Sequence, residues 1–193
     1  MLDKIKEAFR QFTFLTPMDL VQLSSIIKLR RIEKGEHVVR VGEYNYQAMK
    51  VIKGLLYHYV TDENGDEKAL LFVPERMNSG SLQTTINGKA ADENIIALED
   101  TLVIAADVRD LDKLAADNNR ILKMLNHSYR QIITEAGERI KFLIAHSPEE
   151  RYIHFRKTYP HLEQRVRQKD LASYLGVTPT SLSRMRARIM EKS

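Results

Sequence analysis

The stretch from position 168 to position 187, QKDLASYLGVTPTSLSRMRA, restricts the fold of this chain more than any other part of the sequence. Leu171, Ala172 and Leu175 share one face of a first helix, and the small Ala172 allows a second helix to pass close by. Gly176 follows at once, and glycine adopts the left-handed backbone of a tight turn at almost no cost. The pattern therefore predicts two helices joined by a turn.

The second helix has its own start signal and an apolar inner face. Thr178 suits the N-cap, and Pro179 suits the first helical position, where its missing N–H is not needed. Val177 is expected to fill the inside of the turn, while Leu182 and Met185, three positions apart, are expected to be buried. A generic helical hairpin with polar outer faces would also satisfy this apolar periodicity.

The outer face of the second helix carries small, hydroxyl-bearing or cationic residues. Arginine can donate two hydrogen bonds to guanine, hydroxyls reach base edges or phosphates, and the lack of bulk permits close approach to the major groove. The joint fit of turn, core and outer face favours a DNA-binding helix-turn-helix over the generic hairpin. The residues expected to contact DNA are Gln168, Lys169, Thr178, Thr180, Ser181, Ser183, Arg184 and Arg188.

The charge distribution agrees with a nucleic-acid partner. Positions 149–193 hold ten Lys or Arg and five Asp or Glu, whereas the remaining 148 residues hold 20 and 21. Excess positive charge at the end that carries the motif is expected of a protein that meets phosphates. A tail that is basic only for solubility is the alternative, and the coincidence of charge and motif argues against it.

The composition excludes several classes of site. The chain has no cysteine, which excludes disulfides, thiolate zinc sites, cysteine-ligated iron–sulfur clusters and cysteine nucleophiles. No apolar run reaches the roughly 18 residues of a membrane span, and the start MLDKIKEAFRQF lacks the apolar core of a signal peptide. We expect a cytoplasmic protein with no membrane contact, no metal and no cofactor.

Short apolar runs separated by glycines or turns fill positions 29–106. Alternating residues predict a strand at 55–60, and Asn64-Gly65 predicts the tip of a hairpin. About eight strands at this spacing predict an antiparallel barrel or roll rather than βαβ units. The polar stretch 77–94, weakly helical in its middle, interrupts the roll and is where we expect a ligand to be held.

Helices are expected on both sides of the strands. Positions 2–12 form an amphipathic pattern, and Thr16-Pro17 supplies the cap and first residue of a second helix. A short helix is expected over 108–116.

A long apolar stripe follows, with residues spaced by three or four up to position 144. A helix of about 25 residues spans about 40 Å, which is more than one face of a small roll can cover. We expect it to pack against the same helix of a second copy, because a palindromic operator needs two recognition helices. Burial within its own chain is the alternative. The expected dimer contacts are Leu125, Tyr129, Ile132, Ala136 and Ile140.

Ser147 and Pro148 start the next helix, and Glu150 completes a capping box. This helix should end before Pro160, and 162–167 has the pattern of a short extended piece. The expected domains are a β-roll sensor at 1–116, a dimerisation helix at 117–146 and a DNA-binding domain at 147–193.

A roll, a long helix and a C-terminal helix-turn-helix, in this order, resemble the Crp/Fnr family of bacterial transcription regulators. The resemblance covers essentially the whole chain and is strongest at IEKGEHVVRVGE (32–43), VIKGLLYHYV (51–60), IIALED (95–100) and LASYLGVTPTSLSRMR (171–186). It implies an α+β fold: an N-terminal antiparallel β-roll (a double-stranded β-helix, as in cyclic-nucleotide-binding domains), a long dimerisation helix and a winged-helix-like helix-turn-helix. It also implies a homodimer on a palindromic operator and an effector site in the roll, with RNA polymerase as a further candidate partner.

The effector site departs from the family pattern. Family members that bind cyclic nucleotides have a Gly-Glu pair, whose Glu accepts from the ribose hydroxyl, and a later Arg that pairs with the cyclic phosphate. Gly80-Ser81 stands at the place of Gly-Glu, and Asp92 stands at the place of the Arg. A carboxylate there repels phosphate, Glu93 adds to the repulsion, and Lys89 cannot make a bidentate contact. We expect a regulator that does not respond to cyclic AMP and whose effector is unidentified.

Other functions find less support in the sequence. Haem would have to use His37 or His58, and a lone histidine on a strand is usually a packed or surface residue. There is no His-x-His pair, P-loop, GxSxG or HExxH motif, so we expect no enzyme. The remaining alternative is a sensor that binds an unidentified small ligand and acts through protein contacts rather than through DNA.

Overall fold

The computed structural model describes residues 8–191. The chain forms two compact units. The first contains the residues up to His58 together with Phe72–Ile132, and the second contains Tyr59–Leu71 together with the residues from Ile133 onward. Each unit has its own set of buried apolar residues.

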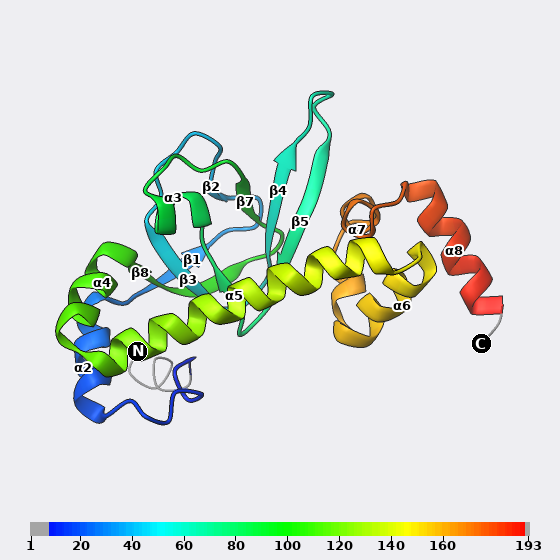
Figure 1. Ribbon diagram of the computed structural model, residues 1–193. Coiled ribbons are helices and arrows are strands. Elements are labelled where there is room, and N and C mark those ends of the chain that lie inside the picture. The colour runs from blue at the N-terminus through cyan, green and yellow to red at the C-terminus, as the bar shows by residue number, and fades with distance from the viewer. Residues whose placement is uncertain (1–7, 192–193) are drawn as a thin grey trace. The chain divides into compact units, whose positions relative to one another are not determined.

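Eight strands are present in the described residues, as the sequence predicts (Figure 1). They are β1 (Lys28–Ile32), β2 (His37–Val39), β3 (Gln47–Lys53), β4 (Leu56–Thr61), β5 (Glu67–Val73), β6 (Asn78–Ser79), β7 (Asn94–Ala97) and β8 (Thr101–Asp107). Two four-stranded sheets result, with the orders β1-β8-β3-β6 and β2-β7-β4-β5. The pairs β1–β8, β3–β8, β3–β6 and β2–β7 are antiparallel. The predicted α+β class with an antiparallel roll is confirmed.

Gly54 lies at the turn between β3 and β4, where no other residue fits. Its φ is 104°, and a Cβ atom there would be 2.5 Å from the Thr101 hydroxyl oxygen and 2.6 Å from the Thr101 Cα. That hydroxyl accepts the backbone N–H of Leu55 at 3.1 Å in the buried interior. The close approach of the two backbones therefore requires glycine at this turn.

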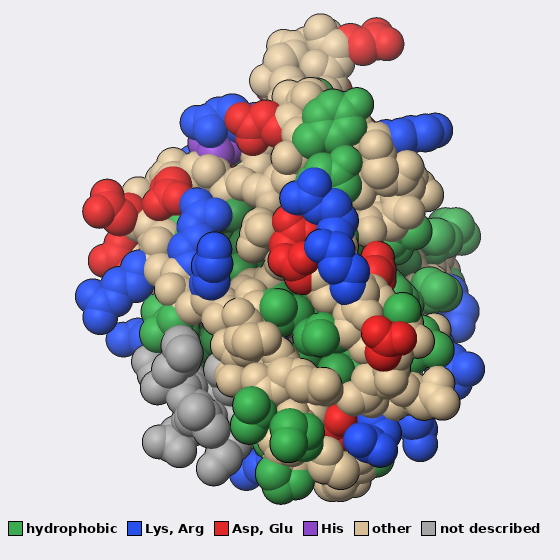
Figure 2. Space-filling model, turned by 90° about the vertical axis from the view of Figure 1, so that its left-hand side faces the viewer, with side chains coloured by type: hydrophobic (Ala, Val, Ile, Leu, Met, Phe, Trp, Pro, Cys, Tyr) green, Lys and Arg blue, Asp and Glu red, His purple; other side chains and the backbone are tan. Residues whose placement is uncertain are grey.

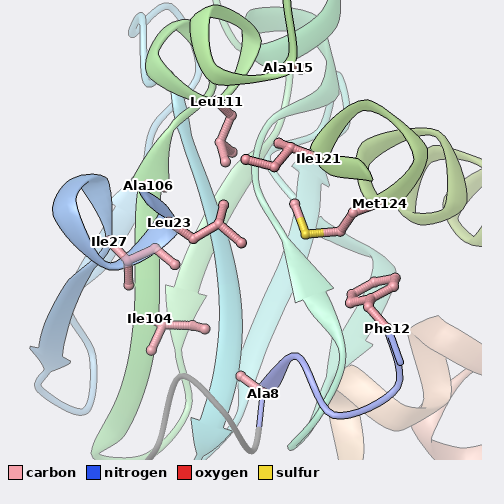
Figure 3. Packing of buried hydrophobic residues seen from close by; sticks show 10 residues of the cluster. All are labelled: Ala8, Phe12, Leu23, Ile27, Ile104, Ala106, Leu111, Ala115, Ile121 and Met124. Carbon is pink, nitrogen blue, oxygen red and sulfur yellow. The ribbon is translucent and has the colours of Figure 1, made fainter. Parts of the chain in front are cut away.

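Helices pack on one face of the β1-β8-β3-β6 sheet. They are α2 (Pro17–Ile26), α4 (Val108–Asp117) and the first part of α5 (Asn119–Ala145). Figure 3 shows their apolar side chains converging with those of β8. Ile104 and Ala106 of β8 belong to this cluster, whereas Val103 and Ala105 are buried on the other face, as the alternation of a strand demands. The sheet is therefore covered on both faces along β8.

The start of α2 is the one that the sequence predicts. Thr16 caps it: its hydroxyl accepts the Asp19 N–H at 3.3 Å, and the Asp19 carboxylate accepts the Thr16 N–H at 2.7 Å. The short helix α3 (Leu82–Asn87) lies in the polar stretch that interrupts the strands, also as expected. The helix expected over 2–12 lies mostly outside the described residues.

The second unit is helical apart from the hairpin segment Tyr59–Leu71. Its helices are the last part of α5, α6 (Pro148–Thr158), the 3₁₀ turn η1 (Leu162–Gln164), α7 (Gln168–Leu175) and α8 (Pro179–Glu191). The capping box at the start of α6 is confirmed, since the Ser147 hydroxyl accepts the Glu150 N–H and the Glu150 carboxylate accepts the Ser147 N–H.

The prediction of an extended segment over 162–167 is wrong. Leu162 is 3% exposed and begins a 3₁₀ turn, with its N–H on the Tyr159 carbonyl and the Arg165 N–H on its own carbonyl. Burial of this one apolar side chain in the helical core draws the backbone into a turn, although the neighbouring polar residues carry no helical pattern.

The surface around α2 and α4 mixes all types of side chain. Figure 2 shows Lys and Arg interspersed with Asp and Glu there, with hydrophobic side chains between them. This face of the first unit therefore presents no field of a single sign. None of the described helices combines the length and the apolar character needed to cross a membrane.

Asp19 is the buried charge that joins α2 to the junction of α4 and α5. Its carboxylate accepts hydrogen bonds from the Arg120 guanidinium at 2.6 Å and from the Asn118 amide at 2.7 Å. The Arg120 hydrogen bond in particular holds the pKa of the Asp19 carboxyl well below its usual range. The ionised carboxylate is therefore the form that stabilises the fold.

We predict that Asp19→Asn lowers the free energy of unfolding at pH 7 by about 1–3 kcal/mol, because it removes charge-assisted hydrogen bonds. Since the folded pKa is depressed, the advantage of the wild type should be complete above about pH 5. It should shrink as the pH falls below the unfolded value of about 3.9. Urea titrations at several pH values would measure this, with Asp117→Asn, at an exposed position that makes no described contact, as the control. An unchanged difference at pH 7 and pH 3 would contradict the prediction.

Candidate nucleic-acid interface

The helix pair α7–α8 has the buried core that the sequence predicts. Leu171, Ala172, Leu175 and Leu182 are fully buried, and Met185 is 2% exposed. These apolar side chains fix the packing of α8 against α7, so that the outer face of α8 is set by its inner face.

The turn between α7 and α8 depends on Gly176. It ends α7 in the left-handed region, with φ 68° and ψ 38°, and its N–H bonds to the Ser173 carbonyl. A Cβ atom at this position would lie 2.9 Å from Nη1 of Arg151 and 3.8 Å from Leu143. Both the backbone conformation and the neighbouring guanidinium therefore favour glycine.

Thr178 forms the N-cap of α8. Its hydroxyl oxygen accepts the backbone N–H of Ser181 at 3.1 Å and donates to the Ser181 hydroxyl at 2.9 Å. Pro179 follows as the first helical residue. The predicted cap is confirmed, and the hydroxyls of Thr178 and Ser181 are thus engaged with one another at the start of the helix.

The exposed side of α8 carries the predicted contact residues Thr180, Ser183, Arg184 and Arg188. Neither arginine forms an ion pair with any residue that the structure describes. Both guanidiniums therefore keep all their donors for a partner outside the chain, in the fork geometry that suits guanine or phosphate.

The amide of Gln168 connects the start of α7 to this face. Its Nε2 donates to the Ser183 hydroxyl at 2.8 Å and to the Pro179 carbonyl at 3.2 Å. The predicted residues Gln168 and Ser183 thus lie together on one exposed surface, and each helps to orient the other.

Arg186 of α8 has a different role from its neighbours. It forms an ion pair with Glu163 at 2.9 Å and lies 5.8 Å from the centre of the Tyr152 ring. The Tyr152 hydroxyl also donates to Glu163. Arg186 therefore holds α8 against α6 and η1, which fits its absence from the predicted contacts.

Arg139 of α5 holds the other end of α7. Its Nη2 donates to the Tyr174 carbonyl at 2.6 Å, and its guanidinium lies 3.7 Å from the centre of the Tyr174 ring. Burial lowers the pKa of Arg139 and raises the pKa of Tyr174. Sequence reasoning missed this residue, because an arginine within an apolar stripe resembles an ordinary surface cation.

Two cations lie at the start of α7. Lys169, a predicted contact, and Arg167, which sequence reasoning missed, both lie near the carboxylate of Glu67. Arg167 precedes the first residue of α7 and also pairs with Asp170 at 2.6 Å. Its place directly before α7, as the N-cap residue, was the sequence signal that could have identified it.

The residues of α5 that are predicted to form the dimer contact differ in how far they are buried within the chain. Leu125, Tyr129 and Ile132 are partly buried within the chain, whereas Ala136 and Ile140 are exposed. Further exposed apolar side chains on the same helix are Leu122 (44% exposed), Leu143 (40%) and Ile144 (80%), which belong to the predicted apolar stripe. Sequence reasoning missed Ile133, which is 71% exposed.

Polar groups occupy the region of the roll where a ligand was expected. His58 is buried, with Nδ1 2.9 Å from Glu93 Oε2 and Nε2 2.9 Å from the Ser79 hydroxyl. Both ring nitrogens are therefore engaged, which argues against His58 as a haem ligand. The Ser81 and Thr84 hydroxyls of α3 are buried without a hydrogen-bond partner in the described residues.

The adjacent carboxylates of Asp92 and Glu93 have different partners. Asp92 is exposed and accepts a hydrogen bond from the Gln83 amide at 3.0 Å, whereas Glu93 bonds to His58. The described residues contain no group of three or more His, Cys, Asp or Glu side chains suited to a metal ion.

Solved structures of known proteins share this architecture. FixK2 from Bradyrhizobium japonicum has a TM-score of 0.74 at 17% sequence identity, over 86% of each chain. A protein described as a transcriptional regulator of the Crp/Fnr family from Eubacterium rectale has a TM-score of 0.74 at 15% identity, over 96% of this chain and 88% of its own. The c-di-GMP-responsive regulator CLP from Xanthomonas campestris has a TM-score of 0.69 at 15% identity, over 90% and 91%. This chain has the Crp/Fnr fold.

The Crp/Fnr likeness lies in the structure rather than in the sequence. Neither the protein-family models nor the curated protein sequences contain a match to this chain. The expectation of this fold from four short motifs is nevertheless confirmed, because those motifs mark turns and core positions that the fold requires.

Proposed function

We propose that this protein is a DNA-binding transcription regulator of the Crp/Fnr type rather than an enzyme, and that α8 is its recognition helix. The observation that carries the proposal is the two-sided character of α8. Its inner face is buried, and its exposed face carries Thr180, Ser183, Arg184 and Arg188. A helix with this outer face suits the major groove, and the start of α7 lies where a first helix meets the backbone. The proposed site of action is the cytoplasm, with RNA polymerase as a further partner.

The proposal includes a homodimer formed through α5. Tyr129, Ile133, Ala136, Ile140 and Leu143 follow each other at intervals of three or four, which places them on one stripe of the helix. The high exposure of Ile133 and Ile140 supports burial against a second copy, since large apolar side chains in such a row seldom remain in water. Two recognition helices would then read a palindromic operator.

The proposal excludes cyclic AMP as the effector. The carboxylate of Asp92 is exposed at the position where a phosphate-binding arginine would be needed, and Ser81 stands in place of a ribose-binding glutamate. Ser81 is fully buried as well. The roll is instead proposed to bind a different small ligand near positions 77–94, or no ligand at all.

Mapping of DNA bound in cells would first supply an operator. On this operator, Arg184→Ala should cost about 1–3 kcal/mol and relax the preference at one base position, because a bidentate base contact is lost. Arg188→Ala should weaken all sequences alike and reduce the salt slope by about one unit, as expected of a phosphate contact. Equal losses on operator and random DNA for Arg184→Ala would contradict base recognition. Absence of any duplex binding would favour the sensor that acts through protein contacts.

A charge on the exposed stripe of α5 should break the dimer. We predict that Ile140→Glu yields monomers, and that Ile132→Glu does the same, because each would bury a carboxylate opposite its own copy. Ile140→Glu is the cleaner variant, since Ile140 is 59% exposed in the chain itself. Ile86→Glu, at a 55% exposed isoleucine on α3, is the matched control and should leave the dimer intact. A wild-type protein that sediments as a monomer at micromolar concentration would refute the prediction.

Cyclic AMP should not bind to the roll at physiological concentration. One charge-assisted contact to phosphate and one contact to ribose are missing, at roughly 1.5–3 kcal/mol each, and Asp92 adds repulsion. Calorimetry with millimolar cyclic AMP should show no saturable heat and no rise in melting temperature. Micromolar affinity would overturn this interpretation of the roll.

A further inference from the structure

The hairpin segment Tyr59–Leu71 brings a carboxylate to the start of α7 within the second unit. Glu67 Oε2 lies 3.1 Å from Nζ of Lys169 and 3.3 Å from Nη2 of Arg167. The Glu67 side chain is one-third exposed and those of Arg167 and Lys169 are just over one-half exposed, so that solvent and ions reach this cluster. The contact is therefore an exchangeable ion pair rather than a buried one.

Backbone hydrogen bonds hold the hairpin in this place. The N–H of Ala69 donates to the Ser173 hydroxyl oxygen at 2.8 Å, and this hydroxyl donates to the Glu67 carbonyl at 3.3 Å. Ala69 is 8% exposed. The main chain of β5 thus docks on α7 one turn after Lys169, and the Glu67 carboxylate is held within reach of the two cations.

Arg167 and Lys169 differ in the acidic partners that remain to them when the Glu67 carboxylate moves away. Arg167 keeps a two-point contact with the buried Asp170, at 2.6 Å and 3.1 Å. Within the described part of the chain, Glu67 is the one acidic partner of Lys169. Lys169 is therefore the cation whose charge the hairpin neutralises.

We propose that Glu67 is an intramolecular competitor for DNA phosphate at Lys169, so that the docked hairpin weakens DNA binding and its release strengthens it. The inference rests on the proposed function, because it assigns Lys169 to the DNA backbone. A phosphate and a carboxylate compete for the same ammonium group, and an uncompensated carboxylate beside a bound phosphate repels it. The hairpin is thereby an autoinhibitory element of the DNA-binding unit.

The test uses the full chain and a fluorescently labelled duplex of random sequence, since phosphate contacts carry no sequence information. Anisotropy titrations over a series of salt concentrations give the affinity and the salt slope. Glu67→Gln should bind about two- to fivefold more tightly at low salt, the factor expected of one or two exposed ion pairs. Its salt slope should be steeper by about one unit, because one more cation releases a counterion.

Glu63→Gln is the matched control. Glu63 lies at the tip of the same hairpin, is exposed and makes no described contact with α7, so that the variant removes the same charge without freeing Lys169. Its affinity should rise by less than about twofold, through long-range charge alone. In a Lys169→Gln background, Glu67→Gln should lose most of its advantage.

Melting temperatures establish that each variant is folded, and Glu67→Asp provides a second variant that keeps the charge but withdraws the carboxylate by one methylene. It should bind more tightly than the wild type. Equal gains for Glu67→Gln and Glu63→Gln, or an undiminished gain in the Lys169→Gln background, would overturn the competition while leaving the proposed function intact. Failure of every variant and of the wild type to bind duplex at low salt would overturn the proposed function, and the competition with it.

Discussion

Two guanidinium groups lie at the end of α7, and they influence the direction in which α8 begins. The last carbonyls of a helix carry partial negative charge and attract guanidinium groups. Arg139 donates to the Tyr174 carbonyl, and Arg151 lies where a side chain at Gly176 would have to be. The chain leaves α7 through a left-handed glycine, after which Thr178 starts α8. These contacts, together with the burial of Leu182 and Met185, determine which face of α8 is exposed.

Local signals of three or four residues were predictable from the sequence, and long-range pairs were not. The N-cap at Thr16, the capping box at Ser147 and the turn at Gly176 depend on consecutive residues whose hydrogen bonds close within one helical turn. By contrast, the ion pairs Asp19–Arg120 and Glu67–Lys169 join positions about a hundred residues apart. The sequence offers many acidic and basic residues that could form such a pair, and only the tertiary packing determines which of them meet. The failure at 162–167 has the same origin, since the burial of Leu162 decides the backbone there.

Several of the described polar groups inside the roll are engaged with one another. His58, Glu93 and Ser79 satisfy one another, and an unpaired polar group in this interior would carry the cost of its desolvation. The Ser81 and Thr84 hydroxyls are left without partners in the described residues. The buried polar groups of this region that lack a partner in the described residues are therefore neutral hydroxyls, whereas the charged side chain of Asp92 lies at the surface.

Net charge describes the C-terminal end of this chain poorly, because many of its basic residues form ion pairs or hydrogen bonds within the chain. Basic residues of the second unit that pair with acids or carbonyls within the chain include Lys68, Arg139, Lys141, Arg156, Arg167, Lys169 and Arg186. Arg184 and Arg188 remain without an ion pair in the described residues, and both lie on the outer face of α8. Attraction to a polyanion depends on charges that are not already compensated. The absence of an ion pair at Arg184 and Arg188 in the described residues therefore supports the proposal that these two arginines are available to a phosphate backbone, which net charge alone would not indicate.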